Sequence, residues 1–589
     1  MSEKANLAQW LEQRAQLEPE QLAYGFLDDG ERPGATLSYG ELGARAATIA
    51  AALLAAGAPG ERALLFFPPG LELIEAFWGC QRAGWAALPA PIASPLRLGR
   101  GLGRLVAIGR DAGVAAILTS ARFRPAAREL AAAIGPRPGG DDIAILTIDE
   151  LEENAAALPP CPRDGNAVAL LQYTSGSTAH PRAAVVCHRH LLYNLERIDA
   201  CQQNDADSVS LSWLPVAHDL GLIVGVLHPL YRGIPAWLMA PAAFLLRPLR
   251  WLEAISLLRA TNSGGPNFAF DLCVARSRPE QRETLDLRSW RYAHLGGETV
   301  RAGTLASFAA ALRPGYGLAE ATLIVAAGRR GERYRLETVS RRQLAEKGLL
   351  TPPAGSDDEA AIVGCGAPIA GTEVVIVDPA RAMPCPPRQV GEIWVRGPSV
   401  VRGYWQNPAE TAATFAARLA GEEGGPPFLR TGDLGFLAHG ELFVTGRLKD
   451  LIIVRGANHY PQDLELCLEQ DEPRLKAGGS AAFALSGPEG EGVALVAEVT
   501  PAFRDEAGGE PGRELIARLR EKVGLEHEIP VVAVALLEPG RLLKTTSGKV
   551  RRQACREAFL RGELALLAAW RKEEPVAGED KKLVDFAHR

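Results

Sequence analysis

The chain has 589 residues, of which 47% are hydrophobic and 23% are charged, and its formal net charge is −6. A chain of this length exceeds what one hydrophobic core supports, so two or more domains are expected. The acidic balance offers no basic field that would favour a nucleic acid partner.

The first half of the chain alternates between helix-like and strand-like patterns. Ser38-Tyr39-Gly40-Glu41 has the spacing of a capping box, which predicts a helix that ends at Gly57. Gly135–Asp142, rich in glycine, proline and aspartate, predicts a loop. The other expected elements are a strand at 62–67, a helix at 72–86 and strands at 114–118 and 143–148. This rhythm predicts a mostly parallel sheet with helices on both faces.

Two later segments differ from this rhythm. Leu220–Leu249 is the most apolar region, but four prolines and two arginines interrupt it, so it predicts a buried interior and not a membrane span. Gly328–Asp358 is charged and rich in arginine. The N-terminal residues contain no apolar signal segment, and the nine cysteines form no Cys-x-x-Cys pair. We therefore expect a cytoplasmic protein with reduced thiols and without stable membrane insertion.

After Ala360 the pattern changes to short strands with tight turns, which predicts a small β-rich subdomain. Its strands are expected at 372–377, 392–396 and 441–445. A compact α/β unit follows from Lys449, with strands expected at 481–485, 493–499 and 532–537.

The sequence thus predicts an α/β fold with two domains. The large N-terminal domain, 1–448, has parallel-type sheets covered by helices, and its part at 360–448 is β-rich. The small C-terminal α/β domain spans 449–570, and a solvated tail is expected at 571–589.

A hydroxyl-rich loop follows the apolar run Ala167–Leu171 and reads Leu-Gln-Tyr-Thr-Ser-Gly-Ser-Thr-Ala-His-Pro-Arg over 171–182. Glycine lets backbone N–H groups approach phosphate oxygens closely, and hydroxyls add donors. Alone, such a run is more often an ordinary loop, since these residues favour turns, so its interpretation depends on other motifs. The residues expected to contact phosphate are Thr174, Ser175, Gly176, Ser177 and Thr178.

Four further clusters accompany this loop at wide spacing. They are Tyr316-Gly317-Leu318-Ala319-Glu320, Arg430-Thr431-Gly432-Asp433-Leu434-Gly435, Gly446-Arg447-Leu448-Lys449-Asp450 and Lys544-Thr545-Thr546-Ser547-Gly548-Lys549. Each cluster is weak alone, but all five occur in the order found in one superfamily. Over almost its whole length, the tail excepted, the chain resembles the adenylate-forming enzymes, which activate carboxylic acids with ATP.

A narrower match points to the fatty acyl-AMP ligases within this superfamily. It is carried by Trp213–Leu222, Ser263–Leu272, Tyr316–Thr322, Gly391–Val400 and Arg455–Pro461. The resemblance implies a fatty acid substrate, ATP and Mg²⁺ as cofactors, and an acyl carrier protein or carrier domain as acceptor. It also implies a mobile C-terminal domain that turns about Lys449, and a family-type insertion at 328–358. No carrier motif follows Lys549, so the carrier is expected on a separate chain.

The resemblance also implies roles for individual residues. Lys549 is the catalytic lysine, whose point charge stabilises negative charge in the transition state. Glu320 is a catalytic residue and the Mg²⁺ ligand, because carboxylate oxygens suit a hard cation. Tyr316 and Gly317 border adenine, and Asp433 accepts the ribose hydroxyls. The other implied nucleotide contacts are Gly296, Gly297 and Glu298 beside adenine and Arg447 at ribose or phosphate.

Each of these residues also has an ordinary structural interpretation. Without the family match, Tyr316 would be a packed core tyrosine, Asp433 a turn residue, and Glu320, Arg447 and Lys549 solvated charges.

Three histidines allow different interpretations. His218 is predicted to be catalytic, acting near the acyl carboxylate, although lone histidines are more often structural. His188 and His190 form a His-x-His pair without an evident third ligand, so no metal is assigned to them.

An apolar set fits either an acyl tunnel or ordinary core, and both interpretations stay open. Its members are Trp213, Leu222, Ile223, Val226 and Leu227.

The hydroxyl-rich loop departs from the family pattern Gly-x-Pro-Lys-Gly, because Ala179, Arg182 and Ala183 occupy the two glycine positions and the lysine position. Arginine keeps the charge, but a planar fork replaces a compact ammonium, and alanine lacks the freedom of glycine at positive φ. Lower activity and loss of catalysis are both compatible with these changes.

We therefore expect a fatty acyl-AMP ligase that forms an acyl adenylate and passes the acyl group to a carrier protein. The nearest alternative is an acyl-CoA synthetase, which differs in the thiol acceptor. The other alternative is a catalytically degenerate nucleotide-binding protein, which fatty-acid-dependent exchange between ATP and pyrophosphate would exclude.

Overall fold

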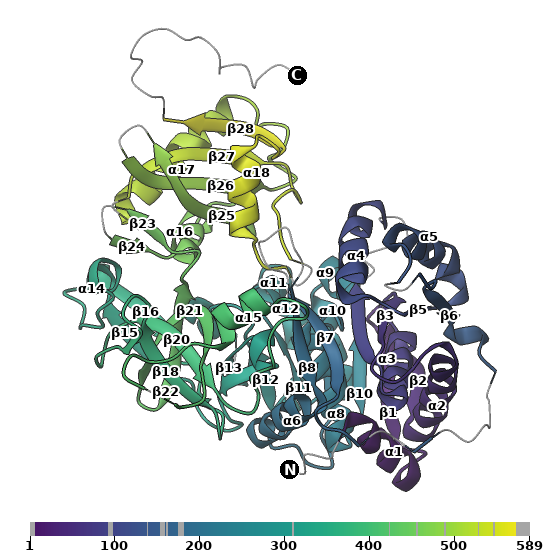
Figure 1. Cartoon of the computed structure of the whole chain (residues 1–589). Helices are drawn as coiled ribbons and strands as arrows, with labels where there is room; N and C mark the ends of the chain where they lie inside the picture. Colours follow the sequence, from purple (N-terminus) through teal and green to yellow (C-terminus); the bar gives the residue numbers. More distant parts are fainter. Residues whose placement is uncertain are drawn as a thin grey trace. The chain divides into compact units, whose positions relative to one another are not determined.

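The computed structural model describes residues 6–91, 98–137, 140–152, 159–160, 163–174, 182–308, 311–422, 424–454, 457–487, 490–527, 529–545 and 548–572. The chain divides into two compact units (Figure 1). The first comprises Met1–Arg341 and Leu350–Thr445, and the second comprises Gly446–Arg589 together with Arg342–Leu349. Among the described residues, no helix combines the length and the apolar character that crossing a bilayer requires.

One sheet of the first unit has helices on both faces, as predicted. Side chains alternate along its central strand, so Leu65 and Phe67 pack in one core with helices α2 and α3, while Leu64 and Phe66 pack in another with α4 and α5. All described strand pairs in it are parallel except β7 with β8. The strand order is β6 (Ala144–Thr147), β5 (Ala116–Thr119), β3 (Arg62–Phe67), β4 (Ala86–Pro91), β7 (Val168–Thr174) and β8 (Arg182–Cys187). The helices are α2 (Tyr39–Ala56), α3 (Leu71–Ala83), α4 (Leu98–Ala112) and α5 (Arg124–Ile134).

Local signals explain the bounds of two of these helices. Ser38 and Glu41 form the predicted capping box of α2, and Gly57 is its C-cap. The helix expected at 72–86 instead ends at Ala83. Gly84 takes φ +71°, where glycine carries no steric penalty, and the chain then enters strand β4 at Ala86.

The second sheet of the first unit is also mostly parallel. Antiparallel strands occupy its edges in the described part of the chain, since β2, β14 and β17 each run against their neighbour. The order is β17 (Ala367–Pro368), β14 (Ile324–Ala327), β13 (Leu312–Gly317), β12 (Tyr292–Leu295), β11 (Asn262–Gly265), β9 (Ser210–Ser212), β10 (Ala236–Met239), β1 (Leu22–Asp28) and β2 (Arg32–Ser38).

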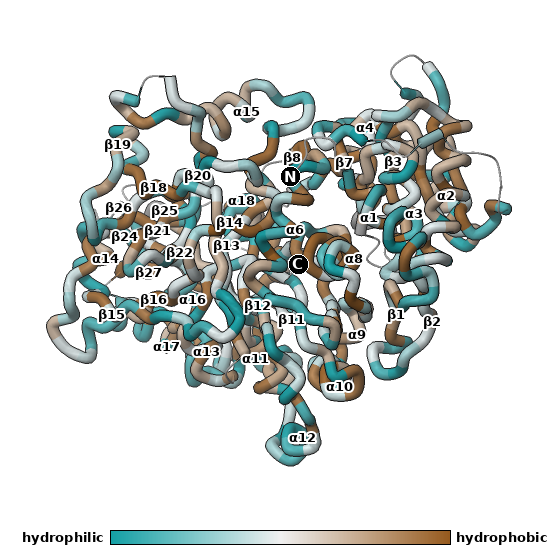
Figure 2. Tube along the Cα trace, turned by 90° about the horizontal axis from the view of Figure 1, so that it is seen from below, coloured by the Kyte–Doolittle hydropathy of each residue, from teal (hydrophilic) through white to brown (hydrophobic). Residues whose placement is uncertain are grey.

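Helices from several parts of the chain accompany this sheet. In Figure 2, α10 is largely hydrophobic, whereas the short α12, which has no buried residue, is hydrophilic. The helices are α1 (Leu7–Leu17), α6 (His188–Gln202), α7 (Asp219–Leu222), a π-helix (Ile223–Leu227), α8 (His228–Arg232), α9 (Pro241–Leu246), α10 (Leu249–Leu258), α11 (Asn267–Ala275), α12 (Pro279–Glu283) and α13 (Ala302–Ser307).

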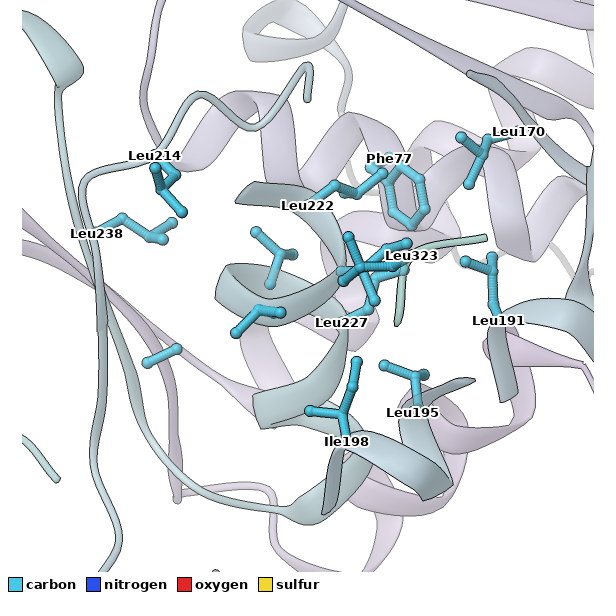
Figure 3. Close-up of a cluster of buried hydrophobic side chains, with 14 of the residues drawn as sticks. Phe77, Leu170, Leu191, Leu195, Ile198, Leu214, Leu222, Leu227, Leu238 and Leu323 are labelled. Atoms are coloured by element: carbon cyan, nitrogen blue, oxygen red, sulfur yellow. The ribbon is translucent and has the colours of Figure 1, made fainter. Parts of the chain in front are cut away.

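The apolar region expected at 220–249 is buried interior. Leu222 and Leu227 pack with Phe77 of α3 and Leu191 of α6 in the cluster drawn in Figure 3. Leu323, from the segment between β13 and β14, enters the same cluster. One continuous apolar core therefore joins the two large sheets of the first unit.

The β-rich part follows as predicted, with β18 packed between β19 and β20 in an antiparallel sheet. The segment at 328–358 adds one strand of a two-stranded hairpin, which is separate from both large sheets, and a short helix. The elements of this region are β15 (Leu336–Ser340), α14 (Arg341–Lys347), β16 (Glu359–Val363), β19 (Met383–Pro384), β18 (Glu373–Asp378), β20 (Gly391–Arg396), α15 (Pro408–Phe415), β21 (Leu429–Ala438) and β22 (Glu441–Arg447).

The second unit has its own core, formed by one face of its main sheet with α16 and α17. The tail predicted as solvated lies, from residue 573, outside the described residues. The elements are β23 (Ile452–Val454), β24 (Ala457–His459), α16 (Pro461–Glu469), β25 (Leu475–Gly487), β26 (Gly490–Val499), α17 (Glu510–His527), β27 (Val531–Leu537), α18 (Arg552–Leu560) and β28 (Leu566–Arg571).

Candidate functional site

The carboxyl ends of β12 and β13 bring two of the predicted motifs together. These strands are parallel neighbours, with Leu295 opposite Pro314, so residues that follow them lie at one edge of the sheet. Gly296 follows β12, and a Cβ there would lie 2.7 Å from the carbonyl oxygen of Gly315. Close approach of the two backbones therefore requires glycine at 296.

Glu298, two residues further on, is tied to the neighbouring helix. Its Oε1 accepts a hydrogen bond of 2.8 Å from the side-chain amide of Asn267, the first residue of α11. The predicted segment 296–298 is thus fixed at both ends, beside the motif that begins at Tyr316.

Tyr316 and Asp433 meet although they come from different sheets. The phenol hydroxyl donates a hydrogen bond of 2.7 Å to Asp433 Oδ2. Both residues are buried, with exposed fractions of 9% and 5%. The residue expected beside adenine and the residue expected at ribose are therefore adjacent in space.

Gly317 has a local reason to be glycine. A Cβ there would overlap the carbonyl oxygen of Leu323, which accepts a hydrogen bond of 2.9 Å from the backbone of Leu318. The chain reverses tightly between β13 and β14 through a 3₁₀ turn at Ala319–Ala321. The turn ends at Thr322, whose φ of +68° is strained for a β-branched residue.

Glu320 lies in this turn, and the segment after β20 holds it at two points. Its backbone carbonyl accepts a hydrogen bond of 3.0 Å from Val401 N–H. Its side-chain Oε1 accepts a bond of 2.7 Å from the hydroxyl of Tyr404. Sequence reasoning identified Glu320 but not Tyr404, because the two residues are far apart in the chain.

Glu392 is a second residue that sequence reasoning missed. It lies within the family motif Gly391–Val400, but its role depends on partners supplied by the fold. The buried carboxylate accepts hydrogen bonds from Arg430 Nη2 at 2.8 Å, Trp394 Nε1 at 2.9 Å and Gly432 N–H at 3.2 Å. These bonds brace the turn that presents Asp433.

His218 lies at the start of α7, and its Nδ1 is 2.5 Å from Asp219 Oδ1. The loop before it adjoins β7, because the side-chain amide of Gln172 donates a hydrogen bond of 3.1 Å to the carbonyl of Ala217. The structure thus connects the His218 loop to the strand that leads into the hydroxyl-rich loop.

The hydroxyl-rich loop itself falls largely outside the described residues, which include neither Ser175–Thr178 nor Ala179. Thr174 ends β7 and lies opposite Arg182, the first residue of β8, while Ala183 is buried.

The predicted residues of the second unit occupy two connected turns. The backbone carbonyl of Arg447 accepts bonds from the N–H groups of Asp450 and Leu451, both at 3.1 Å. In the other turn, Lys549 N–H donates to Thr545 Oγ1 at 3.0 Å. Arg552, at the start of α18, pairs with Asp450 at 3.3 Å, which ties the Lys549 turn to the Arg447 turn.

The histidine pair and the apolar set have structural partners. His188 Nδ1 accepts a bond from Leu7 N–H, and His190 Nδ1 accepts one from Cys187 N–H. The apolar set Trp213, Leu222, Ile223, Val226 and Leu227 is buried throughout. The packing of Leu222 and Leu227 in the cluster of Figure 3 favours the core interpretation for these two residues.

Comparison with known proteins agrees with this arrangement. Residues 11–405 match the family model described as AMP-binding enzyme. A medium-chain fatty-acid–acyl-carrier-protein ligase of Moorena producens is 41% identical over 579 residues, which cover 95% of this chain and 96% of the relative. A 4-hydroxyphenylalkanoate adenylyltransferase of Mycobacterium tuberculosis is 35% identical over 590 residues, covering 97% and 94%.

Among solved structures, the fatty acyl-adenylate ligase of Legionella pneumophila, in complex with acyl adenylate and pyrophosphate, is 37% identical to this chain. The match covers 96% of this chain and 98% of that protein, with a TM-score of 0.71. The chain therefore belongs to the AMP-binding enzymes, whose members form adenylates. Within that family it is a fatty acyl-AMP ligase, as the motifs predicted.

Proposed function

We propose that this enzyme activates a fatty acid with ATP to give acyl-AMP and pyrophosphate, and then transfers the acyl group to the phosphopantetheine thiol of a carrier protein. The observation that carries the proposal is the convergence of Tyr316, Asp433 and Glu320 within the first unit. Motif residues from two distant parts of the chain thus meet within one unit of the fold, where they offer a nucleotide an aromatic face, a ribose acceptor and a metal ligand.

The nucleotide is held mainly by the first unit. Tyr316 presents its ring to adenine, and Gly296, Gly297 and Glu298 border the base. Asp433 accepts the ribose hydroxyls, and its orientation is set by the phenol of Tyr316 and by the turn that Glu392 braces. Backbone N–H groups and hydroxyls of Thr174–Thr178 bind the phosphates.

Glu320 fits the Mg²⁺ that accompanies ATP in this family. Its carboxylate is a hard oxygen donor, and it offers about four lone-pair sites, so accepting a bond from Tyr404 is compatible with binding a cation. When bound, Mg²⁺ offsets the negative charge of the triphosphate. In this role Glu320 orients the nucleotide through the metal and exchanges no proton with it.

In the first step a carboxylate oxygen of the fatty acid attacks the α-phosphorus of ATP. The bond from that phosphorus to the bridging oxygen breaks, and pyrophosphate leaves with the electron pair. Lys549 stabilises the charge that develops on these oxygens, and Arg447 contacts ribose or phosphate. His218, held by Asp219, orients the incoming carboxylate.

In the second step the sulfur of the carrier thiolate attacks the acyl carbonyl carbon. The bond from that carbon to the phosphate oxygen breaks, and AMP leaves. Between the two steps the C-terminal domain rotates about Lys449. A few backbone dihedrals at a linker can absorb such a movement.

Relatives that act on other acids define a second candidate substrate class. The adenylyltransferase named for 4-hydroxyphenylalkanoates matches 97% of this chain, so aryl-alkanoic acids belong in any substrate test. Acyl-CoA formation and nucleotide binding without catalysis are the alternative activities.

The proposal is tested by exchange of pyrophosphate into ATP with fatty acids of graded length and with 4-hydroxyphenylalkanoic acids. Exchange that depends on a fatty acid supports it. Holo-acyl carrier protein and coenzyme A are then compared as acceptors with the preferred acid. Exchange with no acid contradicts catalysis, and a preference for coenzyme A contradicts the carrier-protein assignment.

A further inference from the structure

The segment that follows Gly403 lies along β8, at the edge of the first sheet. Val185 N–H donates a hydrogen bond of 3.0 Å to the carbonyl of Gly403, and Trp405 N–H donates one of 2.9 Å to the carbonyl of Ala183. Tyr404 lies between these bonds, opposite Ala184. Backbone pairing therefore fixes the position of Tyr404 beside the start of β8, where the hydroxyl-rich loop ends.

The side chain of Tyr404 extends from this position to Glu320. Its hydroxyl donates the bond of 2.7 Å to Glu320 Oε1, and its ring is buried, with Phe415 packed edge-on at 5.3 Å between ring centroids. A phenol hydroxyl can donate a hydrogen bond, whereas an ionised carboxylate can only accept one, so the direction of this bond is fixed.

Arg182 also contacts the ring of Tyr404. Its guanidinium carbon lies 5.9 Å from the ring centroid, within the range of a cation–π contact. Its Nη1 lies 2.8 Å from Glu410 Oε2, in the first turn of α15. The residue that replaces the lysine of the family pattern is therefore engaged with Tyr404 and Glu410.

The connection between Tyr404 and α15 is itself rigid. Tyr404 N–H donates a hydrogen bond of 2.9 Å to Thr411 Oγ1, and Asn407 caps α15 by accepting from Glu410 N–H at 3.1 Å. Because Val401 N–H also bonds to the backbone of Glu320, one segment fixes both the main chain and the carboxylate of that residue.

We propose that Tyr404 is a positioning residue for the adenylation step: its hydroxyl orients the Glu320 carboxylate toward the metal of the bound nucleotide, and Arg182 with Glu410 fixes the phenol ring. This inference rests on the proposed function, in which Glu320 binds Mg²⁺. It gives Arg182 a role that suits its planar guanidinium, which contacts the ring while its Nη1 pairs with Glu410.

The test compares Tyr404→Phe with wild type and with Tyr292→Phe. Tyr292 is a matched control, since its hydroxyl donates one bond of 2.8 Å to the carbonyl of Gly328, and nothing assigns it to the site. Tyr404→Phe is expected to raise the Mg²⁺ concentration for half-maximal exchange by about tenfold. Excess Mg²⁺ should restore most of kcat, which a merely structural defect would not allow.

A second measurement does not depend on turnover. Binding of Mn²⁺ in the presence of α,β-methylene-ATP, followed by electron paramagnetic resonance, should weaken by about tenfold in Tyr404→Phe and remain unchanged in Tyr292→Phe. Arg182→Gln should weaken it by about threefold, through loosening of the ring. Arg182→Gln also serves as the second variant if Tyr404→Phe does not fold.

The outcomes separate this inference from the proposed function. If Glu320→Gln weakens Mn²⁺ binding but Tyr404→Phe and Arg182→Gln match wild type, the positioning role is overturned and the function stands. If no acid supports exchange but the Mn²⁺ result is as expected, the proposed function fails, while the role of Tyr404 in orienting Glu320 toward the metal stands. If Glu320→Gln leaves Mn²⁺ binding unchanged, the inference is overturned together with the metal assignment.

Discussion

Tyr316 and Asp433, 117 residues apart in the chain, are joined by a hydrogen bond of 2.7 Å between the phenol hydroxyl and a carboxylate oxygen. The bond connects β13 of the large sheet to β21 of the β-rich sheet, so it couples the predicted adenine and ribose contacts. The two side chains are therefore already oriented relative to each other before a ligand that contacts both of them binds.

Tyr316→Phe keeps the aromatic face but removes the hydroxyl that orients Asp433. We expect the KM for ATP in pyrophosphate exchange to rise by about fivefold with a smaller change in kcat. Asp433→Asn should have a larger effect, and the double variant should be less affected than the product of the two singles, because both changes disrupt one interaction. Effects that multiply independently would contradict the coupling.

Glu392 supports the same site by bracing the turn that presents Asp433. Glu392→Ala removes the buried acceptor of Arg430, Trp394 and Gly432 N–H, so it should lower the free energy of unfolding by about 3 kcal/mol and weaken ATP binding. Glu373→Gln is the control, since Glu373 pairs with Arg396 at the surface of the same sheet. Urea unfolding and ATP titration measure the two effects, and equal stability of the two variants would contradict this role.

The sequence predicted those features that depend on local signals. The capping box of α2 and the buried strand at 62–67 were confirmed, because cap chemistry and apolar runs act over a few residues. The end of α3 was wrong by three residues, since a single glycine C-cap ended the helix before the apolar pattern did. Tyr404 and Glu392 were not predicted as site residues, because their partners are brought to them only by the packing of distant strands.

Burial of two histidines predicts loss of stability in acid. Burial lowers the pKa of His188 to about 4 and that of His190 to about 3, against about 6.5 in an unfolded chain. Below pH 6.5 the unfolded state therefore binds more protons than the folded state, and stability falls as the pH falls toward 4. Each histidine should cost about 2 kcal/mol at pH 5 relative to pH 8.

His188→Gln isolates one of these contributions. The amide oxygen can still accept the bond from Leu7 N–H, but the side chain no longer titrates. Urea unfolding of wild type and variant at pH 8 and pH 5 should show a drop that is about 2 kcal/mol smaller in the variant. An equal drop in both proteins would mean that His188 is protonated in the folded state.

The segment 328–358 is proposed to restrain the C-terminal domain and to disfavour the conformation that uses coenzyme A. Ser340 and Glu359 are register partners, so an Asn-Gly turn can replace Arg341–Asp358 and retain the β15–β16 hairpin. The variant is expected to form more acyl-CoA than wild type. A variant in which α12, which has no buried residue, is replaced controls for the general effect of shortening a surface segment. If the variant without Arg341–Asp358 forms no more acyl-CoA than wild type, the proposed restraint loses its support.

Lys549→Ala tests the central step of the proposed chemistry. Thr545 N–H donates to the carbonyl of Lys549 at 2.7 Å, and Lys549 N–H donates back to Thr545 Oγ1, so both bonds use main-chain groups of residue 549 that alanine retains. The variant should therefore fold, bind ATP measurably, and lose exchange by about a hundredfold or more, because charge developing on the carboxylate and phosphate oxygens is no longer stabilised. Lys522→Ala, which removes an exposed charge from the same unit, should retain wild-type exchange. Near-wild-type pyrophosphate release by Lys549→Ala would show that another cation performs this step.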